Sequence, residues 1–230
     1  MELSKEQVEK LMLTMQECIK EQTKQSMIDF EITLSNVVDK LEICGWTLPT
    51  ELNIYAVNVI GKTDEIKDID DFLLWYYTEE QYSHYQNMLK GILESPIGVG
   101  LKKLIDECVF AFENKKYAIC ADSLVSVIEG ILSTFWEDKS NIRMMKICQA
   151  KVDELTSEKE HLIKKYIWVS YNKFIHKLYE KNDFTKDEPS FINRHWLLHG
   201  RSSYELEEID CLRLFNAVSS LCVITKHQDK

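Results

Sequence analysis

Apolar residues recur along most of this chain at the three- and four-residue spacing that places them on one face of a helix. In the N-terminal part the pattern predicts one long helix or two over residues 4 to about 44, then helices over residues 53–60 and 64–94. Residues 53–60 are also compatible with a strand, because a brief apolar run does not by itself distinguish the two. The turn Gly45-Trp46-Thr47-Leu48-Pro49 interrupts the spacing between the first two segments.

Ser95-Pro96 is the clearest candidate boundary, since serine can cap a helix and proline suits its first turn. We therefore divide the chain into an N-terminal helical region, residues 1–95, and a second helical domain, residues 96–230. In the second part the spacing predicts helices at about 97–113, 117–137, 141–155, 158–181 and 205–227. Side chains suited to helix N-caps are Ser4 with Gln7, Ser140 or Asn141, and Ser157 with Glu160.

The composition supports an all-α fold. Seven glycines and three prolines in 230 residues are few turn formers for a β-sandwich or barrel, while 45% hydrophobic residues suffice for a packed core. No apolar run approaches the roughly 20 residues that span a bilayer, and residues 1–9 lack the apolar centre of a signal peptide. The seven cysteines form no CxxC pair, which favours reduced core thiols in a cytoplasmic protein.

The net charge of −10 argues against broad, non-specific nucleic-acid binding, which depends on a basic face. It leaves room for a small local basic site. Solubility through self-repulsion is the simplest reason for the acidity, although an acidic surface also suits a basic protein partner.

Polar chemistry is concentrated in the segment Asn193-Arg194-His195-Trp196-Leu197-Leu198-His199-Gly200. On a helix, His195 and His199 lie nearly in line, and the long Arg194 side chain can swing toward the same edge. Gly200 lets a helix end immediately after His199. We therefore expect two imidazoles and a guanidinium to gather beside a helix end.

Such a cluster suits metal-independent cleavage of RNA. Imidazole titrates near neutrality and can act as general base or acid. Guanidinium binds phosphate oxygens in a bidentate manner and stabilises the charge that develops during phosphoryl transfer. The 2′-hydroxyl of the RNA would then serve as the internal nucleophile.

The spacing Arg194-x4-His199, with polar His195 directly after the arginine, resembles the R-x(4–6)-H motif of the HEPN superfamily. The Asn-Arg-His and Leu-His-Gly strings before an apolar helix resemble a bacterial branch found in uncharacterised and phage-defence proteins. The helix from Ala118 to Leu132, with Ile128-Glu129-Gly130, is similar to that branch's second helix, and the 45–49 turn is similar to its N-terminal extension. The likeness covers about residues 97–230.

The resemblance implies a HEPN-like helical bundle with an N-terminal helical extension, and a ribonuclease that acts as a homodimer with a composite cleft. Arg194 would bind phosphate and His199 would be the acid or base. His195 would orient the substrate or Arg194, Glu129 would pair with Arg194, and Asn193 would be a supporting donor. No metal or cofactor is implied. The family further suggests a toxin or abortive-infection effector, with a possible antitoxin or regulatory protein as partner.

Other interpretations remain open at this point. Arg194 could cap a helix or pair with Glu129 for structure alone, as in a HEPN-like module that binds protein or nucleotide without catalysis. His195 and His199, at i and i+4, could bind zinc, although the glutamate of an H-E-x-x-H motif is missing. A cluster of lysines could extend a phosphate-binding rim, or simply form a solvated helix face; it comprises Lys164, Lys165 and Lys173.

Overall fold

The computed structural model describes residues 5–226 except 139–142, 157–161, 182–183 and 190, with side chains described from Lys20 onward. Within this part of the chain the fold is all-α, as predicted, and contains nine helices. Their bounds are α1 Lys5–Cys44, α2 Ile54–Lys62, α3 Ile66–Leu93, α4 Val99–Glu113, α5 Tyr117–Ser133, α6 Met144–Thr156, α7 Leu162–Leu178, α8 Arg194–Leu198 and α9 Glu208–Thr225. None of the described helices is both long and apolar enough to cross a bilayer.

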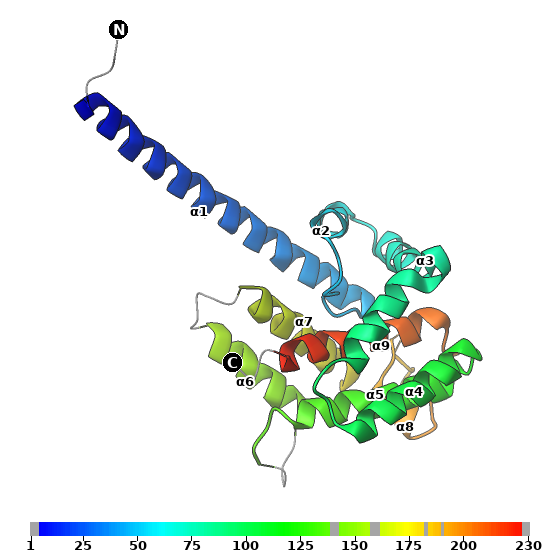
Figure 1. Ribbon diagram of the computed structural model, residues 1–230. Helices are drawn as coiled ribbons and strands as arrows, with labels where there is room; N and C mark the ends of the chain where they lie inside the picture. The colour runs from blue at the N-terminus through cyan, green and yellow to red at the C-terminus, as the bar shows by residue number, and fades with distance from the viewer. Residues whose placement is uncertain (1–4, 139–142, 157–161, 182–183, 190, 227–230) are drawn as a thin grey trace.

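Helix α1 is a single helix of 40 residues, which corresponds to about 60 Å at the usual rise per residue. Figure 1 shows its C-terminal part packed on the other helices and its N-terminal part running out from them. The side chains of residues 20–29 are all exposed, so none of them reaches the core. The predicted cap at Ser4 lies outside the described residues.

Two predicted features of the other helices were wrong. The segment over residues 64–94 is interrupted, because Glu79 to Tyr82 leave helical geometry and Glu80, Gln81 and Tyr82 have positive φ angles. The last helix begins at Glu208 rather than at residue 205. The choice of helix for residues 53–60 is confirmed by α2. The predicted caps at Ser140 or Asn141, and at Ser157 with Glu160, fall outside the described residues.

Helix α9 lies at the centre of the fold, in contact with α3, α5 and α7 (Figure 1). The sequence pattern predicted a single inward face for it. Instead, every residue from Asp210 to Cys222 is buried, including Arg213, Asn216 and Ser220. The reason is that helices surround α9, so its polar faces are covered as well as its apolar face.

The buried polar side chains of α9 find partners in the N-terminal region. Asn216 donates from Nδ2 to the Thr47 carbonyl and hydroxyl at 2.9 and 2.8 Å, and accepts from the Tyr77 hydroxyl at 3.0 Å. Buried polar groups that are paired in this way avoid the cost of lost hydration. The division at residues 95/96 stays a prediction, and the two parts share one core that runs from Leu34 to Ile224.

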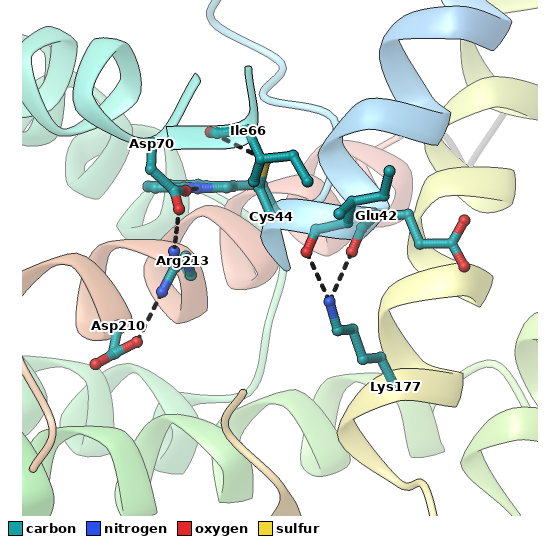
Figure 2. A network of polar contacts seen from close by, with 9 residues as sticks. Glu42, Cys44, Ile66, Asp70, Lys177, Asp210 and Arg213 are labelled. Atoms are coloured by element: carbon teal, nitrogen blue, oxygen red, sulfur yellow. Dashed lines mark hydrogen bonds and ion pairs between the residues drawn. The ribbon is translucent and has the colours of Figure 1, made fainter. Parts of the chain in front are cut away.

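Two ion pairs of Arg213 strengthen the connection between α9 and the N-terminal region, as Figure 2 shows. The Arg213 guanidinium lies between Asp70 of α3 and Asp210 of α9, with N–O distances of 2.8 Å to each carboxylate. Asp70 also accepts a hydrogen bond of 2.8 Å from Trp46 Nε1. Arg213 thereby ties α9 to α3 and to the turn after α1, which makes this network structural.

The end of α1 is joined to the segment that carries the candidate site. Gly45 has a φ of +76°, and the amides of Gly45 and Trp46 close the helix on the Glu42 and Leu41 carbonyls at 3.1 and 2.9 Å. A Cβ at Gly45 would lie 2.0 Å from Cε2 of Phe191, two residues before Asn193. Glycine is therefore required here both for its backbone angle and for the approach of Phe191.

Candidate functional site

The five-residue helix α8 begins where Asn193 caps it. The Asn193 Oδ1 atom accepts hydrogen bonds from the His195 and Trp196 amides at 2.9 and 3.3 Å. Its Nδ2 donates to the Glu180 carbonyl at 2.9 Å, and the residue is buried. Asn193, predicted as a supporting donor, thus holds the start of α8 against the end of the preceding segment.

The helix ends at the residue that the sequence predicted. His199 is its C-cap, and Gly200 follows with a φ of +62°. The Gly200 amide donates to the Leu197 carbonyl and the Arg201 amide to the Trp196 carbonyl, both at 3.0 Å. This pair of bonds is the usual closure of a helix on a left-handed glycine. It places His199 at the rim of the helix, exposed, and fixes the backbone of Arg201.

The two imidazoles lie side by side, which confirms the alignment expected from their spacing. The ring centroids of His195 and His199 are 6.5 Å apart and the ring planes differ by 12°. The His195 ring also meets Tyr179 edge to face, with centroids 6.4 Å apart. His195 is half-buried whereas His199 is exposed, so the pair has one inner and one outer imidazole.

Arg194 is held by a carboxylate and an aromatic ring. Its Nε donates to Glu129 Oε1 on α5 at 2.9 Å, and its guanidinium carbon lies 5.7 Å from the centroid of Tyr179. The Tyr179 hydroxyl donates to the same Oε1 atom. The predicted pairing of Glu129 with Arg194 is therefore confirmed, whereas sequence reasoning missed Tyr179. Both charged side chains keep just over a quarter of their surface exposed.

Burial and nearby charged groups perturb the titration of His195. Burial lowers the pKa of His195 below its ordinary value, and the nearby charges of Arg194, His199 and Lys181 lower it further. The imidazole is thus favoured in its neutral form, which can accept a proton. Burial, with the hydrogen bond to Glu129, raises the pKa of Tyr179, so that this hydroxyl stays protonated and continues to donate.

A second aromatic ring borders the outer imidazole. Phe184, in the loop before α8, meets His199 nearly at right angles with centroids 6.1 Å apart, and its ring lies 5.2 Å from that of Trp196. The guanidinium carbon of Arg201 lies 4.2 Å from the Phe184 centroid. Phe184 and Arg201 had no predicted role. The sequence signal that could have indicated Arg201 is its position two residues after His199.

Other predicted contributors are placed elsewhere. Lys165 pairs with Glu31 at 3.0 Å, and Lys173 pairs with Asp39 and Glu42, so these lysines join α7 to α1 instead of forming a phosphate-binding rim. The cysteines described by the structure are buried and unbridged, as predicted; they are Cys44, Cys108, Cys120, Cys148, Cys211 and Cys222.

Two further features bear on what the site can bind. Among the described side chains, no three His, Cys, Asp or Glu residues are grouped in a way that could hold a metal ion, so His195 and His199 lack a third protein ligand. A surface cavity of about 860 Å³ is lined by Lys115–Ile119 and Tyr204–Ile209, with Leu74. None of the predicted site residues lines it.

The arrangement brings two imidazoles, a carboxylate-bound guanidinium and a second guanidinium together on one surface. It can bind an anion and exchange protons near neutral pH. In comparisons with known proteins, no family model, no curated protein and no solved structure matches this chain.

Proposed function

We propose that this protein is a metal-independent endoribonuclease of the HEPN type. The observation that carries the proposal is the side-by-side placement of His195 and His199 next to Arg194, which Glu129 and Tyr179 orient. The HEPN-like spacing of Arg194 and His199 supports it from the sequence. The acidity of the whole chain does not oppose anion binding here, because the nearby carboxylate, Glu129, is ion-paired with Arg194.

In the proposed reaction an imidazole removes the proton of the RNA 2′-hydroxyl. The 2′-oxygen then attacks the adjacent phosphorus, and the bond to the 5′-oxygen breaks as that oxygen takes a proton from an acid. The products are a 2′,3′-cyclic phosphate and a 5′-hydroxyl. Arg194 binds the phosphate oxygens and stabilises their charge in the transition state, while His199 transfers a proton. In this scheme His195 orients the substrate or Arg194.

Cleavage of single-stranded RNA by the purified chain in EDTA tests the proposal. We expect Arg194→Ala and His199→Ala to slow cleavage at least about 100-fold, as for the loss of a phosphate clamp or a proton-transfer group. The matched control is His176→Ala, which removes an exposed imidazole of α7. Wild-type rates in either site variant would refute the assignment, and loss of activity in chelator would favour the zinc interpretation.

The proposed nuclease is a homodimer in which two copies complete one cleft. Exposed apolar side chains beside His199 support this arrangement, since Phe184 and Leu198 each leave 37% of their surface exposed. Mixing the Arg194→Ala and His199→Ala proteins provides the test, because a composite cleft would contain one intact copy of each residue. Recovery of part of the wild-type rate is expected, whereas no recovery together with a monomeric mass in solution would contradict the dimer.

A second candidate function is a non-catalytic module that binds protein or nucleotide. The observation that favours it is the ion pair itself, since Arg194 Nε is already bound to Glu129 and the pair could serve structure alone. Expression in cells separates the two candidates. A nuclease of the toxin or phage-defence kind would arrest growth, and His199→Ala would relieve the arrest, while a binding module would be harmless in both forms.

A further inference from the structure

Arg201 stands out because its charge has no ion-pair partner within the described part of the chain, while its position is constrained. Among the described residues no carboxylate lies within ion-pair distance of its guanidinium, in contrast to Arg194 and Arg213. The guanidinium carbon lies 4.2 Å from the centroid of Phe184, a cation–π contact that covers one side of that ring. Arginine is scarce in this chain, occurring at positions 143, 194, 201 and 213.

The backbone around Arg201 is held from both directions. Its amide donates to the Trp196 carbonyl at 3.0 Å, which attaches it to the end of α8. The next two residues, Ser202 and Ser203, donate to the carboxylate of Glu188, and the Ser203 amide and hydroxyl do so at 2.7 and 2.8 Å. Burial alone would raise the pKa of Glu188, but these hydrogen bonds lower it, so the carboxylate stays charged and keeps the two loops together.

Arg201 is linked to His199 through one aromatic ring, as Arg194 is linked to His195 through another. The inner imidazole meets the ring of Tyr179, over which Arg194 lies. The outer imidazole meets the ring of Phe184, over which Arg201 lies. Each of the stacked histidines therefore contacts an aromatic ring that a guanidinium also contacts.

We propose that Arg201 is a second phosphate-binding residue of this site and binds the phosphate of a single-stranded RNA that neighbours the one held by Arg194. The inference rests on the proposed function for its choice of RNA. A guanidinium that stacks on a ring keeps its N–H edge available for bidentate contact with phosphate oxygens. A guanidinium that forms no ion pair with any described residue, and that is held in place in an acidic protein, is a cation that a neighbouring phosphate would neutralise. The substrate is consequently a strand with at least two phosphates, and a mononucleotide would engage only half of the site.

Binding of a fluorescent single-stranded RNA with 2′-O-methyl riboses tests this inference, because that probe cannot be cleaved through its 2′-hydroxyl. Affinity is measured by anisotropy between about 50 and 200 mM salt for wild type, Arg201→Gln, Arg201→Lys and Phe184→Leu. Loss of one phosphate contact in Arg201→Gln is expected to reduce the slope of log affinity against log salt by about 0.7. Affinity at the lowest salt is expected to fall roughly tenfold, the size of one charge-assisted hydrogen-bond contact.

The other variants separate charge from geometry. Arg201→Lys keeps the charge and should keep the salt slope, but it should bind more weakly because the planar fork is lost. Phe184→Leu should behave in the same way, since it removes the supporting ring alone. Lys20→Gln is the matched control, because it removes an exposed cation from the projecting part of α1, and it should leave both affinity and slope unchanged.

Wild-type affinity and slope in Arg201→Gln would overturn the inference, as would an equal loss in Lys20→Gln or no RNA binding by the wild-type chain. A parallel assay with cleavable RNA keeps the two proposals apart. Binding that depends on Arg201 without any cleavage would refute the nuclease and retain the phosphate site. Cleavage that proceeds with an unchanged Arg201→Gln binding curve would do the reverse.

Discussion

Gly45 and Gly200 both have left-handed backbone angles at the ends of helices, yet their surroundings differ. At Gly45 a Cβ would lie 2.0 Å from Cε2 of Phe191, whereas at Gly200 no described heavy atom beyond the adjacent residues lies within 4 Å of that position. Alanine at Gly200 should cost about 1 kcal/mol, because the left-handed penalty of roughly 1–2 kcal/mol is partly offset by a less flexible unfolded chain. Alanine at Gly45 adds the displacement of a packed ring, worth about 1–3 kcal/mol, so we expect a loss of about 2–4 kcal/mol.

Urea unfolding of the two alanine variants, followed by circular dichroism, measures this difference. The slopes with denaturant should match that of the wild type, so that midpoint shifts report the free energy of unfolding. The double variant Gly45→Ala with Phe191→Ala supplies the control, since removal of the ring should make the two changes less than additive. Equal losses at Gly45 and Gly200, or strict additivity of the double variant, would refute the explanation by steric contact with Phe191.

Two further predictions concern α8. Asn193→Ala should destabilise the protein by about 1–2 kcal/mol in urea unfolding, because two amides lose their acceptor and the Glu180 carbonyl loses the Asn193 donor. Asn193→Asp should lose less stability, since its carboxylate still caps the helix. Equal losses in the two variants would argue against the cap. The folded-state pKa of His195 is lowered, so the unfolded chain binds more protons at mildly acid pH and the His195 contribution to stability falls as pH drops from about 6.5 through the folded pKa. His195→Gln should therefore show a shallower decline in stability between pH 7 and pH 5, and an unchanged decline would contradict the shift.

The ionic surroundings explain how an acidic chain can hold a basic site. The net charge of −10 describes the whole surface, whereas an interaction between exposed charges is screened over about 8–10 Å. Burial lowers the pKa of His195 most, and the nearby Arg194 and Lys181, both cationic, lower it further. The overall charge thus argues against a broad nucleic-acid-binding face and still leaves room for a local anion site.

Much of the local structure could be predicted from sequence because helices carry their own signals. Apolar spacing located α4 and α5 to within a few residues, and Gly200 marked the end of α8. The His195 and His199 alignment follows from their four-residue separation on one helix. The Glu129–Arg194 pair was expected for a different reason, since the resemblance to the HEPN motif implied it and the ion pair is present.

Features that depend on distant segments were decided only by the tertiary structure. The pattern of α9 shows an apolar face, but it does not show that other helices cover Arg213, Asn216 and Ser220 as well. Likewise, no local rule brings Phe184 of a loop against His199, or Tyr179 against Glu129 of α5. Periodicity indicates which side of a helix is apolar, because residues within a few turns of one another define that face. The number of neighbours around a helix, and the rings that a loop delivers to a site, depend on packing between residues far apart in the chain.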